Sequence, residues 1–583
     1  MPWRPGICKC QEIKLRLKEP LQEVDGHIFI IGREFEGKDK RVLNINAGNQ
    51  PKLNFGDLRF DWKKIRLQLP KYIEFSEEAW GKKLKACENF AKWEKSDFPS
   101  KGQVYKVKKQ LDGLVIGPTD KNKGELWAIC PTLYEKVWGK LYNTNTGYVP
   151  VTIGKWNKNM QKKTYEEARQ QLAGAEGGNK DDLFKLWKKK YDEMNWKRFG
   201  PFSKKADLNT PYCLLKAKNI TDKQNRANKY DKARPIAPQT KHPMRRIFHL
   251  AGKAWSFIAN NMPGEHFVIN HGGLVTDFLE EAQTLEEFGE IGYFIKDIEG
   301  CFPNMDKKKI RFALMDILEN LKKNGKEGVA VPRQDSGKFK SIWYKQGQKQ
   351  AKHRICFPFI DLVNIMNFAL DNTFIKDLEG KIWRQNKGIP MGDPHSPGMT
   401  IITCAWMEQE WMQTIQEEEK RYFKAKRYMD DVICFYSKGE AWDHDKFVRD
   451  ITKSECYMSP LKLTDGDDGT FLGTSFEVTA GNRIRYWLKN KADLSSQWRY
   501  SHFESHTSLT QKRSTMVATL RKVHQMASDK RKLVVSAEKK LKEFLNLKYP
   551  IGMLWKACSR IAREECEGTW ITIRRNIPSL IAK

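Results

Sequence analysis

The chain has 583 residues, enough for three or four domains with cores of their own. Its 104 Lys and Arg outnumber 72 acidic residues, and the net charge of +32 indicates a polyanionic partner such as nucleic acid. No apolar run is long enough to span a bilayer, and the N-terminus has no apolar signal segment. We therefore expect a soluble intracellular protein with no membrane partner.

The 12 cysteines are scattered and form no Cys-x-x-Cys pairs, which is typical of reduced intracellular thiols. Cys8 and Cys10 are close together, and His502 and His506 are four residues apart. Neither pair has partners at the spacing of a zinc finger. The spacing therefore predicts no zinc site.

In the N-terminal part, short apolar runs predict strands at 27–31, 114–118 and 125–130. Asp120 and Lys121 follow the second of these and are expected in a solvated turn, with a functional pair on a hairpin as the alternative. The glycines within 170–182 predict a linker or exposed loop, and a basic helix is predicted over 182–198.

Two further predicted strands, 211–218 and 232–238, are joined by a polar loop and carry cations. Lys216 and Lys218 fall on one face of the first strand, and Arg234 lies on the second. Such a pair of strands could bind a triphosphate. Arg suits this role better than Lys, because its planar guanidinium can bind a phosphate through two hydrogen bonds. Two exposed basic strands are the alternative. An amphipathic helix is predicted over 245–260.

A buried strand is predicted over 291–298, with Asp297 near its end. A turn and a helix over 307–321 follow. Residues 322–354 are basic, contain Gly and Pro, and are predicted to be an inserted loop. The next prediction is an apolar helix over 357–375.

Residues 388–397 contain three prolines and two glycines, which exclude a regular helix. A rigid loop of this kind, before a helix predicted over 398–417, can bring backbone close to a base pair or phosphate. An ordinary helix-entry loop is the alternative.

Asp430 and Asp431 lie between two strand-like segments, which predicts the tip of a hairpin. If this hairpin lies beside the strand of Asp297, the three carboxylates form a cluster that could hold two divalent metals. Such metals would activate a primer 3′-hydroxyl and stabilise charge on the α-phosphate. An Asp-rich turn is the alternative.

The C-terminal part has predicted strands at 470–474 and 483–489 and two amphipathic helices. The apolar positions are Met516, Leu520 and Val523 in one helix and Leu533, Ala537, Leu541 and Leu545 in the other. Residues 481–583 contain 22 Lys or Arg against 8 Asp or Glu, so this part could grip a duplex through its phosphates.

Over about residues 110–550 the chain resembles reverse transcriptases of the right-hand polymerase type, and in particular those of Penelope-like retroelements. Tyr428-Met429-Asp430-Asp431 matches the Tyr-x-Asp-Asp box, and Gly388 to Pro397 resembles the Gly-x-x-Met-Gly-Ser-Pro-x-Ser-Pro loop. Weaker likenesses are Asp120-Lys121 to an N-terminal motif, Lys216-Ala217-Lys218 and Arg234-Pro235-Ile236 to the fingers motifs, Phe471-Leu472-Gly473 to the primer grip, and 502–550 to the thumb.

The resemblance implies an α/β fold with an α+β palm, fingers, a helical thumb and an N-terminal extension. The expected divisions are 1–110 (extension of unknown role), 111–205 (Asp-Lys motif and basic helix), 206–290 (fingers), 291–470 (palm, with an insertion at about 322–354) and 471–583 (primer grip and thumb).

The resemblance also implies RNA-directed DNA polymerase activity with an RNA template, a DNA primer or RNA–DNA duplex, dNTPs and two Mg²⁺ ions, or Mn²⁺, in the nucleus. The implied catalytic metal ligands are Asp297, Asp430 and Asp431. The implied nucleotide-binding residues are Lys216, Arg234, Phe302, Met391 and Gly392. The implied template- and primer-binding residues are Pro390, Ser396, Tyr428, Met429, Phe471, Leu472 and Gly473.

The chain departs from the family at Asp393, where Ser is usual, and at Phe302, where Tyr is common. No GIY-YIG endonuclease pattern is present, so an endonuclease-lacking, truncated or domesticated element is expected, with a free 3′ end as primer. An RNA-dependent RNA polymerase is the alternative enzyme, although Cys301 and Phe302 stand where such enzymes carry a second Asp. A telomerase-like enzyme ranks lower because we recognise no RNA-binding domain in the first 200 residues. The non-enzyme alternative is a basic nucleic-acid-binding protein.

Overall fold

The computed structural model describes most of the chain. The described ranges are 7–17, 22–31, 101–120, 126–216, 230–269, 275–334, 339–345, 352–377, 379–453, 456–465, 469–489 and 500–582 without 504 and 506, together with a few isolated positions between 76 and 82. Lys121, Lys218 and His506 lie outside them, so the predictions for these residues are not addressed. Among the described helices, none has the length and apolar character needed to cross a bilayer.

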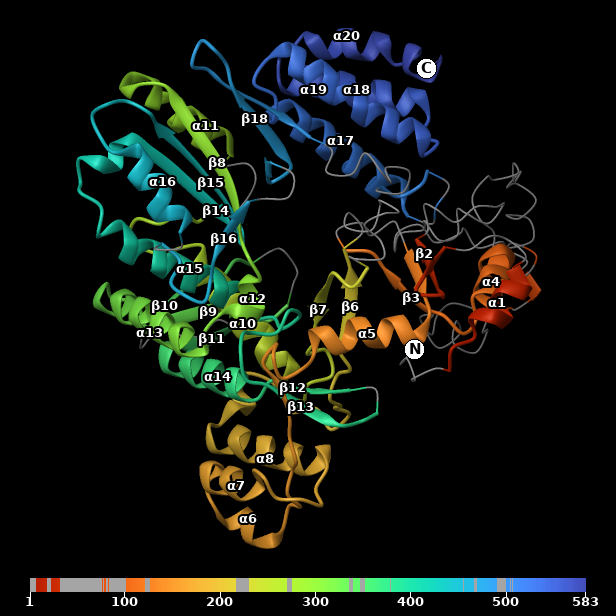
Figure 1. Cartoon of the computed structure of the whole chain (residues 1–583), viewed down its shortest axis with the longest axis vertical. Helices are drawn as coiled ribbons and strands as arrows, with labels where there is room; N and C mark the ends of the chain where they lie inside the picture. Colours follow the sequence, from red (N-terminus) through yellow and green to blue (C-terminus); the bar gives the residue numbers. More distant parts are fainter. Residues whose placement is uncertain are drawn as a thin grey trace.

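A four-stranded antiparallel sheet in the order β14-β15-β8-β16 forms the centre of the fold (Figure 1). Its strands are β14 (Phe423–Tyr428), β15 (Asp431–Ser437), β8 (Ile291–Ile298) and β16 (Leu463–Asp465). Four successive residues of β15, 432–435, are fully buried, because both faces of the sheet are covered. Val432 and Cys434 belong to one hydrophobic cluster, and Ile433 and Phe435 belong to another.

Helices cover one face of this sheet. They are α10 (Arg245–Ala259), α12 (Cys301–Asn304), α13 (Lys307–Lys323), α14 (Phe359–Asp371) and α15 (Ser396–Met412). Four of them confirm predicted helices; the helix predicted over 357–375 is shorter, because β12 (Phe374–Lys376) follows it. β12 pairs with β13 (Ile382–Gln385), which pairs with β5 (Tyr148–Pro150). α11 (Val275–Gln283) contributes to the cluster on the other face, and α16 (His444–Thr452) packs with the first.

The prediction of an inserted loop over 322–354 is wrong. The segment contains β9 (Gly328–Pro332) and β10 (Ile342–Tyr344), which form an antiparallel sheet with β11 (Arg354–Pro358) in the order β10-β9-β11. β9 is buried throughout, with Val329 and Val331 in the main core. Two of the residues that suggested a loop, Gly328 and Pro332, lie at the two ends of this strand.

A second sheet near the N-terminus has the order β1-β2-β4-β3. Its strands are β1 (Glu23–Val24), β2 (His27–Ile31), β4 (Leu126–Ile129) and β3 (Val115–Pro118), and the last three confirm predicted strands. Residues of α1 (Cys10–Leu17), α4 (Lys101–Gln110) and α5 (Pro131–Leu141) share its core. The hairpin of β6 (Tyr212–Leu215) and β7 (Ala233–Ile236) packs on the same core.

The prediction of a linker or exposed loop over 170–182 is confirmed only for its middle, residues 173–179, most of which are exposed. α7 (Tyr165–Leu172) and α8 (Lys180–Glu193) extend into it and, with α6 (Lys158–Lys162), form a small helical unit at the bottom of Figure 1. Capping boxes begin both longer helices, so each N-terminus is fixed by its own side chains. The connecting residues are held in place, since Gly178 N–H donates to Ile153 O at 2.8 Å.

The C-terminal part has a three-stranded sheet and a helical bundle. The sheet has β17 (Thr470–Phe471), β18 (Thr474–Val478) and β19 (Ile484–Leu488), so the predicted single strand at 470–474 is wrong: Leu472 and Gly473, with φ of +53° and +80°, turn the chain there. The bundle contains α17 (Leu509–Gln525) and α18 (Lys530–Asn546), as predicted, and also α19 (Ile551–Glu564), α20 (Thr569–Asn576) and α21 (Ser579–Ala582). α17 to α20 share a core of their own.

Candidate functional site

Three aspartates meet at one end of the central sheet. β14 and β15 form the predicted hairpin, and Met429 at its tip adopts a left-handed φ of +58°. Asp431 lies directly opposite Asp297 on β8, and Ile298 N–H donates to Asp430 O at 2.8 Å. One carboxylate oxygen from each of the three aspartates lies within 4.8 Å of the others. Residues 133 positions apart are thus brought together by strand pairing.

The chemistry of this cluster fits a divalent cation. Its ligands are hard carboxylate oxygens that converge on a half-buried position, which suits Mg²⁺ or Mn²⁺ and leaves coordination positions for substrate oxygens. The nearest cation on β8, Lys296, is directed to another carboxylate, Asp465, at 2.6 Å.

A buried ion pair holds the tip of the β14–β15 hairpin in place. The guanidinium of Arg427, at the end of β14, contacts the carboxylate of Glu408 on α15, and both side chains are fully buried. Arg427 also donates to Met429 O at 3.0 Å and to Ile401 O at 3.2 Å. The pair thus ties the left-handed tip residue to a core helix.

Glu408 is satisfied by further donors. Its carboxylate accepts from Phe267 N–H at 2.9 Å and from the Tyr457 hydroxyl at 2.8 Å. Burial opposes the charge on Arg427, but the Glu408 carboxylate outweighs it and raises the pKa of Arg427 above its ordinary value. No role of Arg427 and Glu408 was predicted, because a pairing across 19 residues has no local sequence signature.

The loop 388–397 lies between α12 and the end of β7. Ile389 N–H donates to Phe302 O at 2.9 Å, and Ala237 N–H donates to Met391 O at 2.8 Å. Gly388 has a φ of +69°, and a Cβ there would lie 2.3 Å from Pro303 O, so only glycine permits this close approach. The loop is thereby fixed against Phe302, five residues from Asp297.

Buried polar groups hold the same loop from inside. Asp393 accepts from His395 N–H at 2.9 Å, and its carboxylate lies 3.2 Å from His395 Nδ1. Burial would raise the pKa of the Asp393 carboxyl, but the contacts with His395 outweigh it and hold that pKa below its usual value. The Ser396 hydroxyl donates to Pro390 O at 2.7 Å and is buried, so it braces the loop and is not exposed to a template.

Both predicted strands are present, as β6 and β7, but β6 is shorter than predicted and ends before Lys216, so of the two only β7 carries a cation, Arg234. Leu214 lies opposite Arg234 in the β6–β7 hairpin, and Lys216 follows the end of β6 and pairs by its N–H with Lys232 O at 3.0 Å. Arg234 donates to Asp120 at 2.8 Å. The expected solvated turn is wrong for Asp120, whose side chain is 10% exposed and which fixes the Arg234 guanidinium.

The aromatic residues of the predicted site differ in exposure. Tyr428 at the hairpin is 37% exposed, and Phe302 is half-buried at the start of α12. Phe471 is fully buried and packs in the cluster behind β15. Its ring is therefore a core side chain, and any contact with nucleic acid at this turn would come from Leu472 and Gly473.

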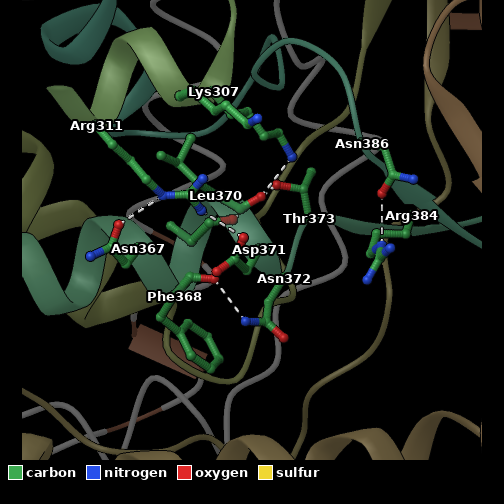
Figure 2. Close-up of polar contacts among 12 residues, drawn as sticks. Lys307, Arg311, Asn367, Phe368, Leu370, Asp371, Asn372, Thr373, Arg384 and Asn386 are labelled. Atoms are coloured by element: carbon green, nitrogen blue, oxygen red, sulfur yellow. Dashed lines mark hydrogen bonds and ion pairs between the residues drawn. The ribbon is translucent and has the colours of Figure 1, made fainter. Parts of the chain in front are cut away.

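A basic cavity of about 460 Å³ lies beside the loop. Its lining includes Arg169, Lys307, Lys308, Arg311, Arg384 and Lys387. Figure 2 shows Lys307 and Arg311 reaching from α13 to the end of α14, where Arg311 contacts Asp371 at 2.6 Å. Burial lowers the pKa of Lys307 to about 8. This cavity could not be predicted from the sequence, because its cations come from separate elements.

An antiparallel sheet with an aspartate hairpin at its end, helices on one face, a cation-bearing β-hairpin and a terminal helical bundle defines the right-hand polymerase fold. Solved structures share this fold. A telomerase from Candida albicans, solved with a fragment of telomeric RNA, matches with a TM-score of 0.51 at 11% identity, over 94% of this chain and 80% of that one.

Two other solved structures match with lower scores. A telomerase from Candida tropicalis has a TM-score of 0.40 at 11% identity, over 88% of this chain and 75% of that one. A Sicinivirus RNA-dependent RNA polymerase has a TM-score of 0.35 at 13% identity, over 62% and 67%. No protein-family model matches the chain, and no curated protein does either.

Proposed function

We propose that the protein is an RNA-directed DNA polymerase that extends a primer 3′-hydroxyl. The observation that carries this proposal is the convergence of Asp297, Asp430 and Asp431 at the end of the central sheet. These carboxylates would hold two Mg²⁺ ions, which would lower the pKa of the primer 3′-hydroxyl and stabilise charge on the α-phosphate and the leaving pyrophosphate. Arg427 and Glu408 act as positioning residues, because they fix the hairpin that carries two of the three ligands.

The incoming nucleotide is proposed to bind between the β6–β7 hairpin and α12. Arg234, oriented by Asp120, and Lys216 would contact the triphosphate. Phe302 would lie under the sugar, where an apolar ring excludes a 2′-hydroxyl and has no acceptor for it. Met391 and Gly392 would present backbone to the nascent base pair. The substrates are therefore dNTPs.

The template is proposed to be RNA that passes the basic cavity beside the loop. Phosphates are the natural ligands of clustered Arg and Lys, and Arg384 and Lys387 lie on the stretch that leads into Gly388. Pro390, Tyr428, Met429 and the turn at Leu472–Gly473 would contact template and primer nearer the aspartates. The C-terminal bundle would hold the RNA–DNA duplex through its phosphates.

Two kinds of reverse transcriptase are candidates for such an enzyme. Met391 before Gly392 supports a Penelope-like reverse transcriptase acting in the nucleus. The likeness to a telomerase over 94% of this chain favours a telomerase-like enzyme as the second candidate. The two candidates differ in the RNA that they would bind, since the Candida albicans telomerase is solved with a fragment of telomeric RNA.

Primer extension by the purified protein tests the proposal. An RNA template carrying a DNA primer is offered with Mg²⁺ and either dNTPs or NTPs. We expect extension with dNTPs alone, ending once at the template 5′ end. Extension with NTPs alone would instead indicate an RNA polymerase. Extension only on a telomeric RNA fragment would favour the telomerase-like candidate, and no extension together with tight binding would indicate a nucleic-acid-binding protein.

A further inference from the structure

Three thiols and one imidazole meet at the N-terminal sheet, far from the aspartates in sequence. They belong to Cys8, Cys10, His27 and Cys130, and one ligand atom from each lies within 4.8 Å of all the others. The fold thus brings candidate partners to Cys8 and Cys10, for which the sequence spacing predicts no zinc site. The partners come from 17 and 120 residues further along the chain, so no local spacing could reveal them.

We propose that these four residues form a structural zinc site. Tetrahedral zinc has Zn–S bonds of about 2.3 Å and Zn–N bonds of about 2.0–2.1 Å, which place a sulfur and a nitrogen about 3.5 Å apart. His27 Nδ1 lies 3.5 Å from Cys8 Sγ and 3.4 Å from Cys130 Sγ. Both distances match an edge of that tetrahedron, and Nδ1 is the ring nitrogen that would bind.

The surroundings of the cluster fit a metal-bound thiolate. Ile28 N–H points at Cys10 Sγ at 3.4 Å, a backbone hydrogen bond that favours negative charge on sulfur. Cys10 and Cys130 are buried, His27 is half-buried and Cys8 is exposed, so the site closes over an ion but has a route of entry. Three sulfurs and one nitrogen in a closed set favour zinc over Mg²⁺ or Ca²⁺, which prefer oxygen.

Ordinary core packing and a disulfide explain the cluster less well. A disulfide would use two of the thiols. It would not explain why the third thiol and the imidazole lie within the same 4.8 Å. The cluster instead joins three separate segments: the start of α1, the start of β2 and the residue that follows β4. Their backbones also meet, since Cys130 N–H donates to Ile28 O at 2.9 Å.

Zinc at this position would fix the sheet that supports Asp120. β3 pairs with β4 along residues 115–118, and Asp120 follows β3 directly and orients Arg234. The zinc site therefore stabilises one edge of the proposed nucleotide-binding region without touching substrate. It is distinct from the three aspartates, and its test does not depend on polymerase activity.

Metal analysis of the purified full-length protein, kept reduced, tests this proposal. We expect one zinc per chain by mass spectrometry after exhaustive dialysis, and the same content in Asp430→Asn, which alters only the aspartate cluster. Cys8→Ser removes an exposed ligand and should lower zinc affinity by more than about 100-fold, since even the loss of an outer hydrogen-bond partner costs about 10- to 100-fold. Cys566→Ser, at another exposed free cysteine, is the matched control and should retain the zinc.

Reconstitution with Co²⁺ gives a second readout on the unaltered protein. Thiolate ligands produce a sulfur-to-cobalt charge-transfer band that carboxylates cannot produce, so the aspartate cluster does not interfere. We expect this band in the wild-type protein and in Cys566→Ser, and a weaker one in Cys8→Ser. A wild-type protein that keeps no stoichiometric zinc and gives no such band would overturn the proposal, as would a Cys8→Ser variant that binds zinc as tightly as wild type.

Discussion

Arg427 shows how a single buried residue can control the geometry of a site that it does not enter. Its guanidinium is fully buried, contacts Glu408 and donates to the carbonyl of Met429, the left-handed residue at the hairpin tip. Removing one partner of a buried ion pair leaves the other charge uncompensated, which costs more than the pair itself contributes.

Arg427→Met should therefore lower the free energy of unfolding by about 3–5 kcal/mol, because the Glu408 carboxylate is left buried without its partner. Urea denaturation measures this change. Lys426→Met, at the half-buried neighbouring position on β14, is the matched control and should change the stability by no more than about 0.5 kcal/mol. Equal effects of the two substitutions would contradict the structural role assigned to Arg427.

Phe302 is proposed to select the sugar of the incoming nucleotide. Phe302→Ala opens the space that the ring fills, so ribonucleotide incorporation relative to deoxynucleotide should rise by at least about tenfold, the effect of roughly 1.4 kcal/mol in the transition state. Single-nucleotide extension with dNTP and NTP measures the ratio. Phe302→Tyr keeps the ring and should keep the selectivity, and unchanged selectivity in Phe302→Ala would exclude this role.

At the scale of elements, the loop 388–397 depends on close backbone packing against α12. Gly388 and Gly380 both have positive φ, of +69° and +93°. A Cβ at Gly388 would meet Pro303 O at 2.3 Å, whereas a Cβ at Gly380 would meet nothing within 4 Å. Alanine substitutions at these two glycines therefore distinguish two contributions to the loss of stability. One is the strained backbone conformation, which both positions share, and the other is the steric clash, which only Gly388 has.

Gly380→Ala should cost about 1–2 kcal/mol of stability through its left-handed backbone alone, and it should leave primer extension unchanged. Gly388→Ala should cost clearly more and should reduce extension, because the loop must move away from Phe302. Urea denaturation and primer extension of both variants measure these effects. Full activity in Gly388→Ala would show that the position of the loop does not matter for the reaction.

The elements also show which features a sequence can predict. Asp430 and Asp431 lie between apolar strands, and this local pattern alone was enough to predict the hairpin. β9 could not be recognised, because its three central apolar residues are flanked by Gly and Pro and become a strand only by packing in the core. The same limit applies to Phe471, whose motif suggested a contact with primer but whose ring lies in the core.

Long-range partners were the largest gap in the candidate site. Glu408 with Arg427, Asp120 with Arg234, and Cys8 and Cys10 with His27 and Cys130 all join residues from separate elements. A single sequence contains no spacing rule for such pairs, because the fold decides which side chains meet. Residues within one motif were predictable, because they are neighbours in the sequence itself.

On the scale of the whole molecule, the basic cavity is one place where part of the excess positive charge gathers. In Figure 1 the central sheet lies at the left, the C-terminal bundle at the top and the N-terminal sheet at the right. The basic cavity lies on the face that leads from α13 to the loop before α15. A template strand bound there would have to be held mainly by its phosphates.

Arg384→Ala should therefore weaken binding of a single-stranded RNA template and reduce the slope of log affinity against log salt concentration by about 0.7, the contribution of one phosphate contact on a single strand. Fluorescence anisotropy between low and moderate salt measures the slope. Arg384→Lys keeps the charge and should keep most of the slope. An unchanged slope in Arg384→Ala would remove this cavity from the template path.

The most direct test of the proposed activity compares primer extension by the wild-type protein and by Asp430→Asn, with RNA template, DNA primer, dNTPs and Mg²⁺. Asp465→Asn is the control, because this carboxylate is exposed and paired with Lys296 outside the three-aspartate cluster. We predict that Asp430→Asn lowers the extension rate by at least about 100-fold with unchanged duplex affinity, while Asp465→Asn extends normally. Extension at the wild-type rate by Asp430→Asn would contradict the assignment of this cluster as the catalytic metal site.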